Sequence, residues 1–316
     1  MNRNSTMKAV VSLVACLCLI CLPKAKAGPV DRSVLMKEPA WALHIDVDAL
    51  RATTAGKHLL AEWEKPDEQA KFAVFKVLFS FDPRKALHGV TLYGSSSAPE
   101  DGVVLIYADF DSARLQKLAE MAEDYKSAPH RQHTLSSWVD AQRREKEGGK
   151  PRTYAAIHTD RVVIFGQKQE RVAHALDVLD RVQPSFKAAA VFPQFGSGVQ
   201  ALVAEGFASR FELPNDGPHA AVFNASRSGW LELRESDGKI LGKVVLEARD
   251  KESAEKIVTL VRGLVALMGL QTEKPESVML TKFLSVQQDG ERAVVNLAVP
   301  ATAVVELLNA GKVAAK

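Results

Sequence analysis

The sequence predicts an α+β protein of two similar halves, each an antiparallel sheet packed with helices, behind a signal peptide. Three observations lead to this prediction. Short apolar strands are joined by hairpin turns, amphipathic helices separate the hairpins, and the same order recurs on both sides of residue 190. Antiparallel hairpins with helices on one face are typical of α/β sandwiches. A ferredoxin-like arrangement is one candidate for each half.

The first half shows the order strand, strand, helix, strand, strand, helix. Its first helix begins at Asp111, because an Asp side chain accepts hydrogen bonds from the free amides of a helix start. Its second pair of strands is joined by the short turn Thr159-Asp160-Arg161. We expect strands at 89–94, 102–109, 134–139, 154–158 and 162–166, and helices at 111–124 and 167–181.

The second half repeats this order. Ser236-Asp237-Gly238 is a strong hairpin signal between its first two strands, and Asp250 is placed to begin the following helix. The resemblance between the halves is one of pattern and turn position, as in GVVLIYADFDSARLQKL beside GKVVLEARDKESAEKIV. We expect strands at 230–234, 240–247, 283–287 and 293–299, and helices at 250–268 and 301–309.

The remaining segments complete the domain assignment. A strand at 41–46 and helices at 48–64 and 67–79 precede the first unit, and a strand at 199–206 precedes the second. The charged, glycine-containing segment 142–152 predicts a solvated, mobile loop. The chain is therefore divided into a signal peptide (1–27), a first α+β domain (28–190) and a second α+β domain (191–316).

The N-terminus has the order of a secretory signal. Arg3 and Lys8 precede the apolar run 9–22, and Ala25-x-Ala27 offers the small residues that signal peptidase accepts. The run is about 14 residues long, whereas a spanning helix needs about 20. The later apolar stretch 257–270 is also too short and contains Arg262. We expect an exported protein, periplasmic or secreted, with no integral membrane segment in the mature chain.

The cysteine distribution supports a mature chain without thiol chemistry. All three cysteines, Cys16, Cys18 and Cys21, lie in the leader. The mature chain therefore has no disulfide, no cysteine nucleophile and no thiolate metal site. An alternative is that Leu13-Val14-Ala15-Cys16 acts as a lipobox, in which case the protein is a lipoprotein anchored through Cys16.

The charge balance argues against a polyanionic partner. The whole chain has 41 basic and 38 acidic residues, and the leader contains four of the basic residues and no acidic one. The mature chain is therefore almost neutral, so nothing in its net charge indicates nucleic acid. With 47% hydrophobic and 25% charged residues, the composition is that of an ordinary globular protein.

Two groups of residues are candidates for metal binding. His44, Asp46 and Asp48 alternate along the first predicted strand, which places them on one face. An imidazole and two carboxylates can hold a divalent metal. In the competing interpretation they form the solvent face of the strand, Leu43, Ile45 and Val47 form its buried face, and Asp48 caps the next helix.

The second group is His130-x-x-His133, in a predicted loop after Pro129. Two imidazoles at this spacing can bind zinc or copper, but no third ligand lies nearby in the sequence. The other histidines are scattered and indicate no site of their own: His58, His88, His158, His174 and His219.

Catalytic motifs do not support an enzyme. Ser253-x-x-Lys256 resembles the nucleophile motif of penicillin-recognising enzymes, but their Ser-Asp-Asn and Lys-Thr-Gly elements are missing. The sequence also lacks Gly-x-Ser-x-Gly, a phosphate loop, a dinucleotide fingerprint and His-Glu-x-x-His. We therefore favour a protein without catalytic activity and expect no cofactor.

The predicted helix 250–268 has an unusually wide apolar surface, because Leu260 and Leu267 lie outside its main stripe. We favour burial of this helix between the two halves. The alternative is contact with a partner protein or a second copy of the chain through Leu260 and Leu267.

These observations favour an exported, non-enzymatic binding or assembly protein of unidentified ligand. Duplicated halves commonly form a cleft or concave face. One alternative is a metal-dependent hydrolase or metal-binding protein that uses His44, Asp46 and Asp48, or His130 and His133. A second alternative is a regulator that docks a membrane or envelope partner through helix 250–268.

Overall fold

The computed structural model describes residues 31–66, 69, 82–186, 198–203, 218–270 and 275–314. The leader with its three cysteines, the predicted helix 67–79 apart from residue 69, and the boundary near residue 190 lie outside these residues. Within the described residues, no helix has both the length and the apolar composition needed to cross a membrane.

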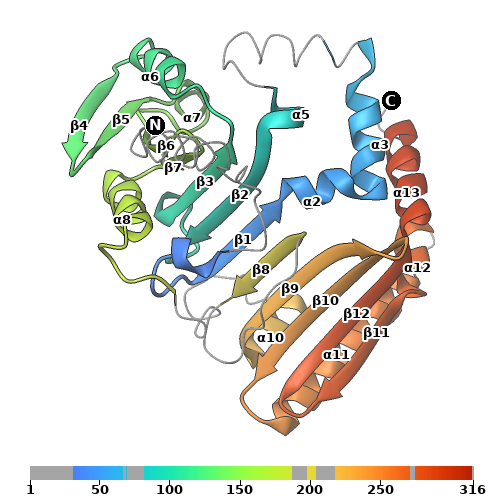
Figure 1. Ribbon diagram of the computed structural model, residues 1–316. Helices are drawn as coiled ribbons and strands as arrows, with labels where there is room; N and C mark the ends of the chain where they lie inside the picture. Colours follow the sequence, from blue (N-terminus) through green and yellow to red (C-terminus); the bar gives the residue numbers. More distant parts are fainter. Residues whose placement is uncertain are drawn as a thin grey trace, which may run out of the picture.

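The protein has an α+β fold built on a continuous antiparallel sheet (Figure 1). The twelve described strands pair in the order β11-β12-β10-β9-β8-β1-β2-β3-β7-β6-β5-β4. Their bounds are β1 (Trp41–Asp46), β2 (Leu87–Gly94), β3 (Gly102–Ala108), β4 (Lys126–His130), β5 (His133–Val139), β6 (Arg152–Thr159), β7 (Val162–Gly166), β8 (Val199–Val203), β9 (Ser226–Ser236), β10 (Lys239–Ala248), β11 (Leu284–Asp289) and β12 (Arg292–Pro300).

Helices connect these strands and cover parts of both faces of the sheet. The α-helices are α2 (Val47–Ala52), α3 (Thr54–Trp63), α5 (Pro83–Ala86), α6 (Ser112–Glu120), α7 (Ala141–Glu147), α8 (Gln169–Leu179), α10 (Pro218–Ala225), α11 (Lys251–Gly269), α12 (Pro275–Thr281) and α13 (Ala301–Ala314). Two short 3₁₀ helices are η1 (Arg32–Val34) and η2 (Pro99–Asp101).

The strands on the two sides of the sheet centre follow the same order. Outward from β1 the neighbours are β2, β3, β7 and β6, and outward from β8 they are β9, β10, β12 and β11. In each case a hairpin is followed by a helix, α6 or α11, and a second hairpin returns beside the first. The first side carries an additional hairpin, β4–β5, and α7.

Two parts of the predicted architecture are wrong. The halves do not form separate sandwiches, because β1 pairs with β8 from Trp41↔Val203 to Ile45↔Val199 and joins all described strands into one sheet. The ferredoxin-like arrangement is also wrong. Each side has hairpin, helix, hairpin, helix, whereas that fold interleaves its strands through split β-α-β units.

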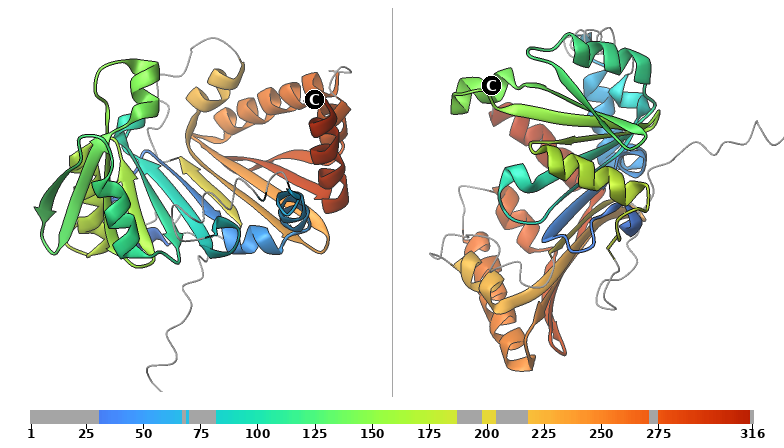
Figure 2. Two further views of the ribbon diagram at one scale, coloured as in Figure 1. Left: turned by 90° about the horizontal axis from the view of Figure 1, so that it is seen from above. Right: turned by 90° about the vertical axis from the view of Figure 1, so that its left-hand side faces the viewer.

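The main core lies between α8 and one face of the sheet. Val172 and Leu176 of α8 are fully buried, as are Leu105 of β3 and Ile164 of β7. Because side chains alternate along a strand, the neighbours of Ile164 point to the opposite face, where α6 lies. On the second side, α11 runs along one face of its sheet, as both views in Figure 2 show.

Several local predictions also change. The predicted helix 48–64 is two helices, α2 and α3, separated at Thr53, whose hydroxyl accepts a hydrogen bond from the Gly56 amide. The predicted mobile loop 142–152 contains α7, because Asp140 caps a helix there by accepting from the Arg143 amide. The Asp111 and Asp250 caps are confirmed.

Helix α11 packs on its own half, so its predicted burial between the halves is wrong. Ala254, Ile257 and Val258 in its first turns are buried against a cluster that includes Ala248 and Ala293. The elements with which α11 makes its main contacts are α10, α12, β10, β11 and β12, all from the second half.

The break between α2 and α3 gives a stability prediction. A Cβ atom at Gly56 would overlap the Leu50 carbonyl oxygen, so Gly56→Ala requires a backbone shift. We expect this substitution to lower the free energy of unfolding by at least about 2 kcal/mol in urea denaturation. Gly263→Ala in α11 is the matched control. Its Cβ would meet no atom within 4 Å, so we expect stabilisation by about 0.5–1 kcal/mol. Equal effects of the two substitutions would contradict the prediction.

Candidate functional site

The structure separates the predicted group His44, Asp46 and Asp48. His44 and Asp46 lie on the buried face of β1, with 4% and 2% of their surfaces exposed, while Asp48 lies in α2. Asp46 Oδ1 accepts a hydrogen bond from the Ala49 amide at 2.9 Å. Asp48 forms an ion pair with Arg51 at 2.7 Å. The expectation that the polar residues face solvent is therefore wrong, and the three side chains do not converge.

A short hydrogen-bonded chain explains how His44 is accommodated in the core. His44 Nδ1 lies 2.8 Å from Thr91 Oγ1, and the Thr91 hydroxyl donates to the Tyr107 hydroxyl at 3.5 Å. Burial raises the pKa of Tyr107 to about 12, although its hydrogen bond with Thr91 acts in the opposite direction. This arrangement satisfies buried polar groups, as a stable core requires.

The second predicted pair, His130 and His133, lies in a hairpin rather than a loop. His130 ends β4 and His133 begins β5 directly opposite it. Arg131 in the two-residue turn has a positive φ of 54°, which the tight connection requires. The predicted loop is therefore wrong, because β4 pairs with β5 along its whole length.

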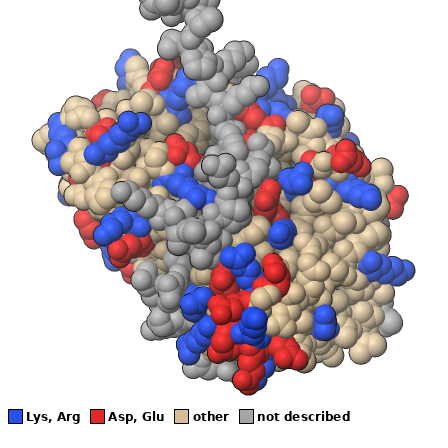
Figure 3. All heavy atoms as spheres, turned by 60° about the horizontal axis from the view of Figure 1, so that its bottom comes forward, with Lys and Arg blue, Asp and Glu red and all other residues tan. Residues whose placement is uncertain are grey.

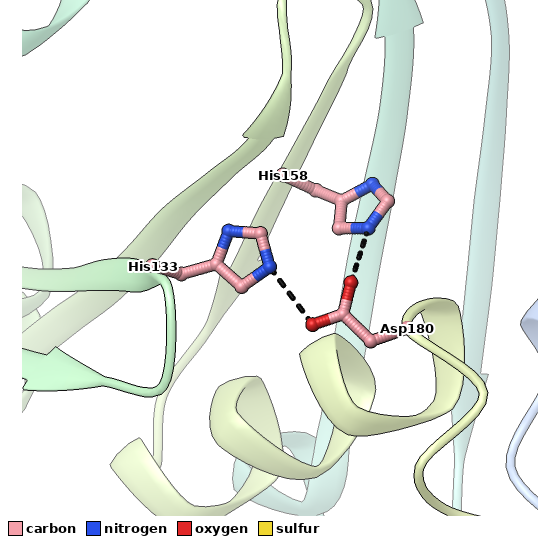
Figure 4. A group of neighbouring side chains, drawn as sticks. All are labelled: His133, His158 and Asp180. Atoms are coloured by element: carbon pink, nitrogen blue, oxygen red, sulfur yellow. Dashed lines mark hydrogen bonds and ion pairs between the residues drawn. The ribbon is translucent and has the colours of Figure 1, made fainter.

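The structure places His133 beside two residues that sequence reasoning did not select. His158 comes from β6, and Asp180 caps the C-terminus of α8. His133 Nε2 and His158 Nε2 each lie 2.9 Å from a different oxygen of Asp180, as Figure 4 shows. One potential ligand atom from each residue lies within 4.8 Å of the others. Among the described residues, this is the group of three that could hold a metal ion.

The surroundings of this histidine–aspartate cluster favour an ionised carboxylate. Burial alone would raise the pKa of Asp180, but hydrogen bonds from His158 and His133 outweigh it and hold that pKa below its usual range. The exposed fractions of the side chains are 10% for His133, 18% for His158 and 11% for Asp180. The cluster is therefore largely shielded from water while remaining reachable.

His130 belongs to a neighbouring pair. Its Nε2 lies 3.0 Å from Asp177 Oδ1, and the same oxygen accepts a hydrogen bond from Arg131 Nε at 2.7 Å. Asp177 is already neutralised by an arginine, so His130 contributes to fixing the hairpin on α8 rather than to the group of three.

A second feature is an apolar pocket between α6 and the sheet face opposite α8. Its volume is about 310 Å³. No residue of α6 is buried, although the helix is amphipathic and turns apolar side chains towards the sheet. The lining residues are Leu115, Gln116, Leu118, Ala119, Ala122, Ser136, Trp138, Ala155, Ala156, Ile157, Val163 and Phe165. None of these described residues carries a charge.

One edge of the pocket is polar. Gln116 Nε2 donates a hydrogen bond to the Tyr125 hydroxyl at 2.7 Å, and that hydroxyl lies 3.2 Å from Ser136 Oγ. Gln116 and Ser136 both line the pocket. These groups can exchange hydrogen bonds with an uncharged polar group of a ligand.

The two predicted interface residues of α11 differ in their surroundings. Leu260 is half-buried against the cluster that contains Ile257 and Val258, whereas 57% of Leu267 is exposed. Leu270, just beyond the helix, is 75% exposed. The Ser-x-x-Lys motif lies at the other end of α11, where Lys256 forms an ion pair with Glu252 on the protein surface.

Charges of both signs are mixed on the surface. On the face that Figure 3 shows, Lys and Arg side chains are interspersed with Asp and Glu, and a broad area beside them carries few charges. This face therefore presents no extended field of one sign.

Comparison with known proteins gives a likeness of fold alone. No protein-family model matches the chain, and no curated protein matches it. Among solved structures it is similar to TP0453. Crystal form III of that protein aligns with a TM-score of 0.49 and 11% identity, over 91% of this chain and 100% of the other. Crystal form I gives a TM-score of 0.47 at 11% identity, over 89% and 97%. At these values the likeness carries no argument about function.

The buried Tyr107 predicts a loss of stability at alkaline pH. Its pKa in the folded protein is raised to about 12, above the unfolded value of about 10, so the folded state holds this proton more tightly. Its stabilising contribution is complete below pH 10 and is lost as the pH rises towards 12. We expect Tyr107→Phe to lose less stability than the unmodified protein between these pH values, measured by urea unfolding. Identical pH profiles would contradict the assignment.

Proposed function

We propose that this chain is an exported, non-enzymatic binding protein that takes a small apolar ligand into the pocket beneath α6. The observation that carries the proposal is an amphipathic helix that lies over an apolar sheet face and buries none of its own residues. A ligand that covers this exposed apolar surface gains roughly 25 cal/mol of favourable transfer free energy for each Å² removed from water.

The equivalent helix of the second half supports this proposal. We infer that residues 28–190 and 191–316 are two versions of one unit, in which α6 and α11 occupy corresponding positions after the first hairpin. Helix α11 buries Ala254, Ile257 and Val258 against its sheet, whereas α6 buries no residue. The helix–sheet interface is therefore closed in one unit and left open in the other, as a ligand site requires.

The lining defines the class of ligand. A volume of about 310 Å³ lies at the lower end of the range of small-molecule pockets, roughly 300–1,000 Å³. A charged group would be desolvated there without a partner, because the described lining has no ionised side chain. The pocket therefore suits a compact apolar molecule with one hydroxyl or carbonyl, which Gln116 and Ser136 can contact.

The proposal is tested by titrating the protein with N-phenyl-1-naphthylamine, an uncharged apolar probe whose fluorescence rises on leaving water. We expect saturable binding at one site. Ala119→Trp places a large side chain in the pocket and should weaken binding at least tenfold. Met121→Ala is the control, because 83% of Met121 is exposed and this residue does not line the pocket. Binding that is unchanged by Ala119→Trp in a folded variant would refute the site.

A second candidate is docking of a protein partner, including a second copy of the chain, through Leu260 and Leu267 of α11. The exposure of Leu267 and Leu270 favours it. We expect Leu267→Lys to reduce self-association in light scattering while leaving the unfolding free energy within about 0.5 kcal/mol of its original value. Leu260→Lys should destabilise the fold, because Leu260 packs against the core. A protein that is monomeric with or without Leu267→Lys would count against self-docking.

A further inference from the structure

We propose that His133, His158 and Asp180 form a binding site for a divalent transition-metal ion of the zinc class. The site lies at the end of the sheet where the β4–β5 hairpin meets the C-terminus of α8, on the face opposite the apolar pocket. It is therefore independent of the proposed ligand pocket.

The three side chains are held in place by elements that are fixed for other reasons. β5 and β6 are paired from Leu135↔Ala156 to Val139↔Arg152. Helix α8 is anchored by the fully buried Val172 and Leu176. His133 and His158 are 47 and 22 positions from Asp180 in the sequence, yet the fold already holds the three side chains together. An ion that binds them therefore causes little further loss of conformational entropy.

The three ligand atoms lie within 4.8 Å of one another, so an ion can be accommodated once their separations adjust. Zinc binds imidazole nitrogen and carboxylate oxygen at about 2.0–2.2 Å, which separates tetrahedral ligand atoms by about 3.4 Å. The nitrogen–oxygen distances of 2.9 Å at Asp180 therefore need to widen by about half an ångström. Both rings already direct Nε2 at the carboxylate (Figure 4), so neither needs to rotate.

The donor set selects the kind of metal. Two imidazole nitrogens and one carboxylate suit zinc and its neighbours, whereas magnesium and calcium prefer sites made of oxygen alone. Three protein ligands leave a fourth position for water or a small molecule. Gln132 Nε2 donates to Asp180 Oδ2 at 2.8 Å and positions the carboxylate from outside the ligand set.

Binding must exchange a proton for the ion on each ring. In the hydrogen-bonded arrangement, Nε2 of each histidine donates to Asp180, and an ion can bind Nε2 only when that proton is lost or moves to Nδ1. His158 Nδ1 is buried and has no hydrogen-bond partner among the described residues. Because such outer partners commonly strengthen metal sites by 10–100-fold, we expect weaker binding than at a four-ligand structural zinc site.

The test begins with protein dialysed against EDTA and titrated with zinc in competition with a chromophoric chelator. We expect one equivalent to bind. Asp180→Asn keeps the shape of the side chain, and His158→Gln keeps a polar side chain of similar length. Each should weaken zinc binding at least tenfold. His88→Gln is the matched control. His88 also pairs with two carboxylates, Asp48 at 3.0 Å and Asp109 at 3.2 Å, but these lie on opposite ring nitrogens and do not converge.

Two results would overturn the proposal. One is the absence of zinc binding by the unsubstituted protein, in which case the cluster is a hydrogen-bonded clamp between hairpin and helix. The other is undiminished binding after Asp180→Asn and His158→Gln, which would assign the zinc to surface histidines. If the variants fail to fold, the visible spectrum of the unsubstituted protein loaded with cobalt tests whether the ion is bound by four ligands. Intense bands of a four-coordinate site support the proposal, and the weak bands of hydrated cobalt refute it.

Discussion

The antiparallel pairing of β1 with β8 is the interaction on which the rest of the structure depends. It joins two sheets with the same strand order, and its register runs from Trp41↔Val203 to Ile45↔Val199. A further backbone hydrogen bond, from the Asp46 amide to the Gly198 carbonyl at 2.8 Å, extends the contact to the start of α2. Without this pairing each half would expose an unpaired strand edge, so the two halves stabilise each other through their backbones.

The two sides of this shared sheet differ in how closely their helices pack. On the first side, α8 contributes the buried residues Val172, Ala175, Leu176 and Val178, whereas α6 buries no residue and lies over an open pocket. On the second side, α11 itself closes the sheet face. In the first half, the helix that packs into the core is therefore a different helix from the one that lies over the proposed ligand pocket.

The sequence predicts the local elements well because their signals are local. Hairpins such as Asp237-Gly238, with φ values of 51° and 70°, and caps such as Asp111 and Asp250 depend on neighbouring residues alone. Burial does not. In sequence, His44 and Asp46 look like the solvent-exposed face of a strand. In the structure they are buried, where His44 Nδ1 hydrogen-bonds with the Thr91 hydroxyl and Asp46 Oδ1 accepts a hydrogen bond from the Ala49 amide.

The same limit applies to the candidate sites. His133 is recognisable from its spacing with His130, but its actual neighbours, His158 and Asp180, come from another strand and a helix end. Their convergence depends on the bulge between Ile157 and Thr159 and on where α8 stops, which no residue pattern specifies. The pocket beneath α6 cannot be predicted from the sequence either, because the amphipathic pattern of a helix is the same whether the helix packs tightly or loosely on its sheet.

The strand order also determines which strands are exposed at the edges of the sheet. Of the described strands, β4 and β11 are the edge strands. The unpaired backbone N–H and C=O groups of an edge strand can pair with another extended chain. β4 is short, begins with Lys126 and contains Pro129, which has no amide hydrogen to donate. Addition of a further strand along the β4 edge is therefore disfavoured.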